Sequence, residues 1–475
     1  MALVVLSLPT VPGARAAVRG FKAQTLGLLT LACLLVAAPA TAQVNYAVSG
    51  NTAYVTYSYS ASGDIVIAST YNGYPVTSIG GGAFYGCANL TNVTIPNSVT
   101  SIGGGAFTLC RSLTNVTIPN SVTNIGGLAF SNCISLTSVT IPNSVIRIEL
   151  WAFRDCWGLA SVTIPNSVTT IGSGVFSRCP SLTNLSVAAA NPAYSSLDGV
   201  LFNKARTTLL TYPGGRAGSY VIPNSVTTIP DAAFSDSANL TSVTIPDSLT
   251  SLGYEAFYSC RSLTSVTIGN GITAIGYGAF WNCTSLTSVT IPNSVASIGS
   301  SAFQDCRSLT SVTIPNSVIG IGWFAFYHCT SLTKVTIPNS VTGIGGHAFE
   351  GCTSLTNLTF LGNAPGYFGG AFYNVGAGAT VYYYCGTTGW GPTYDGMPTV
   401  MLCPPQIAPG SAGVKPGGFG FTLTRLTNQT IVVEASTNLP DWQPIWTNTM
   451  PGASADFVDP EWLNHSNRFY RARSD

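Results

Sequence analysis

The chain has 475 residues, and its 18 Lys and Arg against 17 Asp and Glu give a formal net charge of +1. Only 7% of the residues are charged, against roughly 25% in an ordinary soluble domain. Sparse and balanced charge excludes a nucleic-acid-binding protein that works through a basic face, and it argues against a polybasic membrane-surface protein. Because 46% of the residues are hydrophobic, intrinsic disorder is excluded as well.

Residues 1–42 have the features of a secretory signal peptide. Arg15, Arg19 and Lys22 precede the apolar run TLGLLTLACLLVAA, and the small residues A-T-A follow it. This order predicts cleavage after Ala42. A membrane anchor is the alternative, but the run of about 14 residues is shorter than the about 20 that a spanning helix needs. We therefore expect a secreted or cell-surface protein without a transmembrane segment after cleavage.

Most of the remaining chain is one phrase repeated. Residues 287–309 read TSVTIPNSVASIGSSAFQDCRSL, and the general pattern is L-x-x-V-x-I-P-x-x-V-x-x-I-G-x-x-A-F-x-x-C-x-x-L. A period in the twenties with apolar residues at fixed offsets is typical of a leucine-rich solenoid, here of about fourteen coils. The phenylalanine of the pattern recurs every 23 residues, apart from one gap of 58, at Phe84, Phe107, Phe130, Phe153, Phe176, Phe234, Phe257, Phe280, Phe303, Phe326, Phe349 and Phe372.

The first half of each repeat predicts a short parallel strand. In Val289-Thr290-Ile291 apolar and polar residues alternate, so Val289 and Ile291 should point into the coil and Thr290 outward. Pro292 has no backbone N–H to donate, so it should end the strand. Stacking of successive coils is what buries the inner face of each strand.

The second half of each repeat predicts the return path. Val295 and Ile298 should supply a second apolar side. We expect Gly299 to permit a backbone conformation that a Cβ would hinder. Ala302-Phe303 should begin a short helical or 3₁₀ turn whose ring fills the coil. The expected fold class is therefore a β-rich repeat solenoid of short parallel strands and short helical or 3₁₀ turns.

Breaks in the pattern suggest the domain organisation. The gap of 58 exceeds two repeats of 23 by 12 residues, and NPAYSSLDGVLFNKARTTLLTYP fits such an insertion, with a hairpin turn at Asn203–Arg206. The β-rich start should cap the open end of the core. After a Pro/Gly-rich linker, FTLTRL, TIVVEAS, PIWTNT and RFYRAR predict a small β-sandwich. The expected parts are a signal peptide (1–42), an N-terminal β cap (43–78), the solenoid (79–372) with an inserted hairpin unit (191–213), a C-terminal cap (373–403), a linker (404–418) and a small β domain (419–475).

The repeats resemble the BspA-like bacterial leucine-rich repeats (type 5). The I-P-N-S-V-T-x-I-G-x-x-A-F-x-x-C units carry this resemblance, which covers about residues 43–395. The insertion also resembles the interrupting unit seen in that family. The resemblance implies a secreted or surface-displayed protein, and several such proteins are adhesins that bind host or partner proteins. It implies no catalytic residues for this chain.

Ten of the 13 cysteines fall at one offset of the repeat, where we expect buried thiols that pack as small hydrophobic groups. Their Cβ vectors should run parallel, which disfavours disulfides between neighbouring coils. Cys385 and Cys403 flank the C-terminal cap, and we predict that they pair. The thiol ladder comprises Cys87, Cys110, Cys133, Cys156, Cys179, Cys260, Cys283, Cys306, Cys329 and Cys352.

The residues that could belong to an enzyme or a metal site do not form a recognised motif. The sequence contains no C-x-x-C pair of the kind that binds zinc. None of the three histidines belongs to a known catalytic motif with a nucleophilic residue. Asp155 and Asp305 share a repeat offset but should lie many coils apart, whereas paired catalytic carboxylates need about 5–10 Å. The IGGGAF stretches follow the repeat phase and should be turns rather than phosphate loops. We therefore expect no catalytic residues, no metal and no cofactor.

Two surfaces remain as candidates for ligand binding. The outward residues of the strands form a neutral ladder of threonines, including Thr267, Thr290 and Thr313, although exposed strands prefer threonine in any case. The other surface surrounds F-x-x-C-x, where the repeats differ most and where aromatic and arginine side chains, common interface anchors, stand out. Its candidate residues are Tyr258, Trp281, Tyr327, Arg111, Trp157, Arg261 and Arg307.

These features favour a non-catalytic secreted or cell-surface protein that mediates protein–protein interaction or adhesion. The alternative is a secreted glycan-binding protein that uses Tyr258, Trp281 and Tyr327. A secreted hydrolase would need ionisable groups that converge in one pocket, which the linear sequence does not show. The expected partner is an extracellular protein or polysaccharide and not a nucleic acid.

Overall fold

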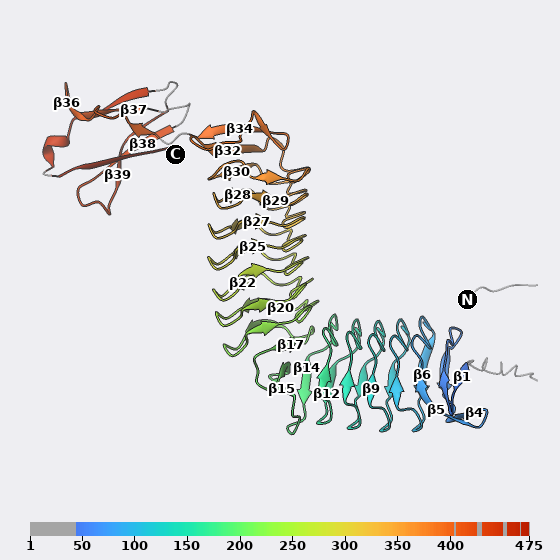
Figure 1. Ribbon diagram of the computed structural model, residues 1–475. Coiled ribbons are helices and arrows are strands. Elements are labelled where there is room, and N and C mark those ends of the chain that lie inside the picture. The colour runs from blue at the N-terminus through green and yellow to red at the C-terminus, as the bar shows by residue number, and fades with distance from the viewer. Residues whose placement is uncertain (1–43, 403–404, 425–429, 450–453, 466, 475) are drawn as a thin grey trace, which may run out of the picture. The chain divides into compact units, whose positions relative to one another are not determined.

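The computed structural model describes residues 44–402, 405–424, 430–449, 454–465 and 467–474 (Figure 1). The signal peptide expected at residues 1–42 therefore lies outside the described residues, and so does Cys403 of the expected Cys385–Cys403 pair. Between residues 44 and 402 the chain winds into coils that stack in sequence order, and three ladders of hydrogen bonds join each coil to the next. The fold is a β-rich solenoid of 23-residue repeats, as the sequence predicts.

The first ladder is a column of parallel strands built from the V-T-I part of each repeat. The strands are in register, so that Val289 lies beside Val266 and Val312 of the neighbouring coils. Their threonines point to solvent and their valines into the core. The column contains β3 (Gly63–Val66), β6 (Leu90–Thr94), β8 (Asn115–Thr117), β10 (Ser138–Thr140), β12 (Ser161–Ile164), β14 (Asn184–Val187), β18 (Gly218–Val221), β20 (Leu240–Thr244), β22 (Ser265–Thr267), β24 (Ser288–Thr290), β26 (Ser311–Thr313), β28 (Lys334–Ile337) and β30 (Asn357–Phe360).

The second ladder is a parallel column of mostly two-residue strands that end on the isoleucine before the glycine. Ile298 pairs with Ile275 on one side and with Ile321 on the other. This column contains β5 (Tyr74–Ile79), β7 (Ser101–Ile102), β9 (Asn124–Ile125), β11 (Arg147–Ile148), β13 (Thr170–Ile171), β19 (Thr228–Ile229), β21 (Ser251–Leu252), β23 (Ala274–Ile275), β25 (Ser297–Ile298), β27 (Gly320–Ile321), β29 (Gly343–Ile344) and β31 (Gly366–Tyr367).

The third ladder replaces the helical or 3₁₀ turn that the sequence predicts, and that part of the prediction is wrong. Residues 299–306 form consecutive hydrogen-bonded turns. Ser301 and Asp305 have φ angles of 55° and 57°, which a right-handed helix does not allow. Alternate N–H groups point out of the coil, and those of Ser301, Phe303 and Asp305 donate to carbonyls of the next coil. We call this side of the coils, from the repeat's I-G to its Cys, the turn face.

The glycine of the I-G pair has a different purpose from the one expected. The backbone of Gly299 does not lie in the left-handed region. Instead, a Cβ at Gly299 would lie 2.7 Å from the carbonyl oxygen of Ile275 and 2.9 Å from the carbonyl carbon of Gly276. The repeat therefore needs glycine because the backbone of the previous coil passes too close for a side chain.

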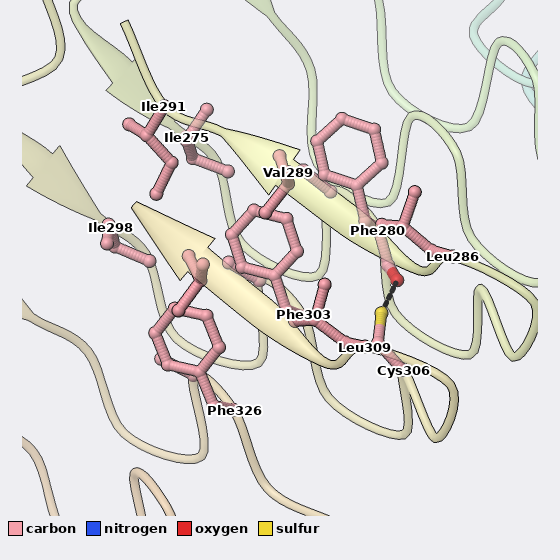
Figure 2. Packing of buried hydrophobic residues seen from close by; sticks show 14 of the residues in the cluster. Ile275, Phe280, Leu286, Val289, Ile291, Ile298, Phe303, Cys306, Leu309 and Phe326 are labelled. Carbon is pink, nitrogen blue, oxygen red and sulfur yellow. Dashed lines mark hydrogen bonds between the residues drawn. The ribbon is translucent and has the colours of Figure 1, made fainter. Parts of the chain in front are cut away.

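The core is a column of stacked phenylalanine rings (Figure 2). Within each run of regular repeats, successive rings are stacked, with centroids 4.5 to 5.6 Å apart and angles of 4° to 26° between their planes. Burial of a phenylalanine side chain contributes about 1.5–3 kcal/mol, so each coil stabilises the fold only while its neighbours cover it.

The repeat cysteine lies beside this column and has a hydrogen-bonding role. Cys306 Sγ donates to the carbonyl oxygen of Phe280, 3.2 Å away (Figure 2). Nine of the ten ladder thiols contact the phenylalanine carbonyl of the preceding coil in this way, and Cys87 donates to the carbonyl oxygen of Ser58 in the N-terminal cap. All ten are buried and unbridged. The Phe280 carbonyl also accepts the N–H of Cys283 in its own coil at 3.3 Å, so the thiol of the next coil is a second donor to the same oxygen.

The regular stack is interrupted between β14 and β18 by residues 188–217, which we call the inserted unit. It contains the antiparallel strands β15 (Tyr194–Leu197), β16 (Val200–Asn203) and β17 (Leu209–Thr211), with β16 and β17 joined across the turn at 203–206. The buried amide of Asn191 fixes its start, because its nitrogen donates to the carbonyls of Pro165 and Val168 and its oxygen accepts two N–H groups. Tyr212 stacks on Phe234 and takes the place of the repeat phenylalanine.

Irregular coils close both ends of the solenoid. At the start, β1 (Tyr46–Ser49) pairs with β2 (Thr52–Val55), and β2 and β3 extend the two strand columns, so this stretch forms an atypical coil. At the far end, β32 (Thr380–Tyr384), β33 (Thr393–Tyr394) and β34 (Met397–Leu402) extend β30, and Trp390 and Tyr394 pack against Phe360. The short strand β4 (Thr70–Tyr71) pairs with β5.

The C-terminal module consists of two antiparallel sheets around one small core that includes Phe421, Ile431 and Phe457. The described residues of the four runs expected to be strands lie in strands, apart from the ends of the runs. The stretch expected to be a linker, 404–418, contributes two short strands within its described residues 405–418, and both pair antiparallel with the strand that follows. The elements are β35 (Gln406–Ile407), β36 (Gly413–Lys415), β37 (Gly418–Thr424), β38 (Thr430–Ser436), β39 (Gln443–Thr449), β40 (Ser454–Asp459), the 3₁₀ helix η1 (Trp462–Asn464) and β41 (Phe469–Ser474).

Candidate functional site

The described residues contain no group of three or more His, Cys, Asp or Glu side chains that could hold a metal ion. His328 Nδ1 lies 3.6 Å from Asp305, and the ring of His347 stacks on Phe324 and contacts Glu350. These histidines therefore pack and pair on the turn face. No helix in the described parts of the chain is both long and apolar enough to cross a membrane.

The strand threonines form a flat polar face. Thr267, Thr290 and Thr313 are exposed on β22, β24 and β26. They line a shallow groove of about 490 Å³ together with Asn270 and Asn293. The groove presents hydroxyl and amide groups at the coil spacing and no charged side chain, so it offers hydrogen bonds but no strong anchor.

The aromatic residues predicted on the turn face are present there but partly covered. Trp281 meets Tyr258 edge to face, with ring centroids 5.3 Å apart. The guanidinium of Arg178 lies over the Tyr258 ring at 5.5 Å, and Tyr327 stacks on His328. All three rings are half-buried. They form part of the turn face, but each has a neighbour against it.

Three exposed aromatic residues of the turn face were not singled out from the sequence. Tyr254, Tyr277 and Trp323 directly follow the glycine of the I-G pair, and they are 62%, 42% and 45% exposed. Tyr254 and Tyr277 meet edge to face at 6.4 Å, and Trp323 packs against Phe368 at 5.1 Å. Their position in the repeat could have revealed them. Glycine or serine occupies the position after the I-G pair in many other coils, so an aromatic residue there is unusual.

The inserted unit brings together charged residues from coils on either side of it. Arg178 Nε lies 3.2 Å from Asp155 Oδ1 and 3.0 Å from Asp236 Oδ2. Arg154 also pairs with Asp155, at 3.3 Å. Asp155 is thus far from Asp305, as expected, but it has a second acidic neighbour in Asp236. This cluster could not be predicted from the repeat pattern, because the path of the inserted unit decides which coils meet.

A cavity of about 280 Å³ opens beside this ion pair. Burial raises the pKa of the Asp236 carboxyl, and the neighbouring Arg178 partly opposes that rise. Two of the predicted residues, Trp157 and Arg261, also line the cavity, and Trp157 is 54% exposed. Arg261 Nε donates to Ser259 Oγ at 3.2 Å.

The other predicted arginines do not join this cluster. Arg307 pairs with Asp305 of its own coil at 3.1 Å, and Arg111 is exposed on a coil in the first half of the solenoid. A second cavity of about 240 Å³ lies on the other side of Arg178 and is lined by Arg154, Tyr254 and Tyr277 among others. The predicted residues are therefore divided among several places, and two of them, Trp157 and Arg261, lie beside Arg178 and its two aspartates.

Comparison with known proteins identifies the family. The model of the BspA type leucine rich repeat region matches residues 77–197, 216–323 and 273–385, which together make up more than half of the chain. The chain belongs to the BspA-type leucine-rich repeat family. No curated protein matches the chain significantly.

Several solved structures are similar to this BspA-type protein. A leucine-rich cell surface protein from Faecalibacterium prausnitzii is 30% identical, with 66% of this chain and 92% of that chain covered and a TM-score of 0.49. A leucine-rich repeat protein from Bacteroides ovatus is 29% identical over 76% of this chain and 98% of its own, with a TM-score of 0.43. The pneumococcal vaccine antigen PcpA shares the fold at 20% identity, with 72% and 92% covered and a TM-score of 0.54.

These relatives are bacterial leucine-rich repeat proteins, and the family is one of repeat scaffolds with surface or protein-interaction roles. Members of such a family are generally not enzymes. The repeat provides the scaffold, and the ligand of each member depends on side chains that vary between coils.

Proposed function

We propose that this BspA-type protein is a non-catalytic, secreted or cell-surface protein that binds an extracellular partner protein through its turn face. The observation that carries the proposal is the row of exposed aromatic residues Tyr254, Tyr277 and Trp323, which lie at one offset of different coils. Exposed Trp and Tyr side chains are the residues most often responsible for binding energy at protein interfaces. Adhesion to a host or neighbouring cell is one form that such binding takes.

The remaining features of the chain support this proposal. The signal-peptide pattern at residues 1–42 directs a chain out of the cell. The sheet face is uniform from coil to coil and carries few charges, whereas the turn face differs in every coil and so has the variety that a specific partner requires. Arg178 and Arg307 are held in ion pairs with neighbouring aspartates, an arrangement suited to binding rather than to proton transfer.

The test compares two matched sets of substitutions in the purified chain. Tyr254→Ala, Tyr277→Ala and Trp323→Ala together should abolish capture of the partner from extracellular extracts. Thr267→Ala, Thr290→Ala and Thr313→Ala together should leave capture unchanged, because they alter only the sheet face. Equal capture by both triple variants would contradict the proposal. Retention of the chain inside the cell when it is expressed with its own N-terminus would contradict the secreted location.

A further inference from the structure

The cavity beside the inserted unit brings together four charged residues in a chain that has few. Asp155, Arg178, Asp236 and Arg261 line it, and they come from coils before and after the inserted unit. Trp157 lines its edge with an exposed ring. We propose that this cavity binds one neutral sugar residue of a glycan, with Trp157 as the stacking surface and the charged side chains as hydrogen-bond partners.

The balance of charge favours a neutral ligand. Two carboxylates and two guanidinium groups leave the cavity without net charge, so an ionic ligand gains little from entering it. An ionic ligand would also have to compete with the contacts of 3.0 and 3.2 Å between Arg178 and its two aspartates. Hydroxyl groups both donate and accept, so a polyhydroxyl ligand matches the carboxylate acceptors and the guanidinium donors at once.

The apolar part of the cavity fits the other side of a sugar. Trp157, Pro180 and Ala238 provide carbon surface next to the polar groups. A sugar ring has C–H groups on its faces and hydroxyl groups around its edge, so it can stack on an indole while its edge reaches polar side chains. Aromatic side chains are favoured at such boundaries between apolar and wet surface.

The size and stiffness of the cavity indicate how much of a glycan it holds. Its volume of about 280 Å³ lies just under the about 300–1,000 Å³ of sites for drug-sized ligands, which suits a single ring rather than a long oligosaccharide. Arg178 is held between Asp155 and Asp236 before any ligand arrives. Side chains that are already ordered lose little conformational entropy on binding, so they favour even a small ligand.

This inference does not depend on partner binding by the aromatic row of the turn face. Trp157 and Arg261 are not part of the row formed by Tyr254, Tyr277 and Trp323. Loss of one activity with retention of the other would therefore show which of the two proposals fails.

The test uses the full purified chain on a glycan microarray, followed by titration calorimetry with the free oligosaccharide that binds best. Trp157→Ala and Arg261→Ala should each weaken binding at least tenfold. Arg307→Ala is the matched control for Arg261, because it occupies the same repeat offset away from the cavity and pairs with Asp305. Trp281→Ala controls for loss of a turn-face tryptophan. Both controls should change affinity less than twofold.

Three results would overturn the inference. One is the absence of binding to any glycan on the array. A second is an equal loss of affinity in Trp157→Ala and Trp281→Ala. The third is a bound glycan whose affinity survives both Trp157→Ala and Arg261→Ala. Because Trp157 and Arg261 are exposed, unchanged thermal unfolding of these variants would show that an observed loss does not come from misfolding.

Discussion

Arg178 and Asp236 form an ion pair with 3.0 Å between Nε and Oδ2, and this pair joins the coil before the inserted unit to a coil after it. The same guanidinium contacts Asp155, so three charged groups share one partly buried site. Most coils of the solenoid contact only the coils next to them in the sequence. The Arg178–Asp236 pair instead joins two coils that the inserted unit separates in the sequence. It ties the two regular parts of the solenoid together at the place where the repeat fails.

Replacement of Arg178 by Met should destabilise the protein by about 1–3 kcal/mol. The substitution leaves Asp155 and Asp236 partly buried without their shared cation, and removal of one partner of a buried pair costs more than the pair contributes. The lower figure reflects the partial exposure of these side chains. Urea unfolding measured by circular dichroism checks the prediction, with Arg111→Met as the exposed control. Equal stability of the two variants would contradict it.

The ladder thiols should not react with iodoacetamide at pH 8 while the chain is folded. Burial raises the pKa of Cys133 and of Cys179 to about 12, and only the thiolate is nucleophilic. Intact mass spectrometry should find all ten ladder thiols unmodified under native conditions. After unfolding in guanidinium chloride all ten should be labelled. Native labelling of Cys133 or Cys179 would show that the coils open more readily than this packing implies.

Gly299→Ala should destabilise the solenoid by about 1–3 kcal/mol, because the new methyl group meets the Ile275 carbonyl oxygen and the backbone must move. Gly343→Ala is the matched control. A Cβ at Gly343 has nothing within 4 Å and its φ is not positive, so this change should alter stability by less than about 0.5 kcal/mol. Thermal unfolding of the two variants and of the parent protein measures the difference. A similar loss of stability in both variants would be inconsistent with the close approach of neighbouring coils at Gly299.

Asn191→Ala should destabilise the inserted unit by about 2–4 kcal/mol. The buried amide makes hydrogen bonds of 2.6 to 3.0 Å with two carbonyls and two N–H groups, and the substitution would remove all four bonds. Hydrogen exchange followed by mass spectrometry should show faster exchange in β15 and β16, whereas β24 and β26 should keep the exchange of the parent protein. Unchanged protection of β15 would be evidence against this role.

The C-terminal module should lose stability in acid through Glu434. Hydrogen bonds from Arg471 and then Arg473 lower the pKa of Glu434 below its usual 4.5. A carboxyl with a lowered pKa in the folded state stabilises the fold above its usual pKa, and that contribution is lost as the pH falls through the lowered value. Hydrogen exchange of β38 should therefore show more opening at pH 3 than at pH 7, after correction for intrinsic rates. In Glu434→Gln this difference should shrink, and an unchanged difference would count against the assignment.

The repeat allowed much of the scaffold to be predicted from sequence. The alternation in Val289-Thr290-Ile291 and the proline after it predict a strand of known direction and face, and the structure confirms this. The phase of Cys306 predicts a buried position, although the hydrogen bond to Phe280 could not be foreseen, since it depends on the geometry of the preceding coil. Because the repeats share one pattern, the packing predicted for one coil applies to the others.

The turn face was harder to predict, for two physical reasons. The A-F-x-x-C run resembles a helical turn in sequence, but hydrogen bonds to the next coil compete with helical ones and prevail, as at Phe303. The grouping of Asp155, Arg178 and Asp236 depends on how the inserted unit turns the chain, which no local pattern encodes. A functional site formed where a repeat is broken is therefore the part that sequence reasoning misses.

The direction of the turn-face hydrogen bonds has a consequence for how such proteins change in evolution. The N–H of Phe349 donates to the carbonyl of Ala371 in the following coil, and in the last coil the carboxylate of Asp395 accepts from the N–H of Phe372 at 2.8 Å. One acidic side chain thus provides an acceptor that a following coil would otherwise supply to the phenylalanine N–H. Whole 23-residue units can then be duplicated or deleted upstream by unequal recombination without leaving this N–H unpaired, provided that the terminal aspartate is kept.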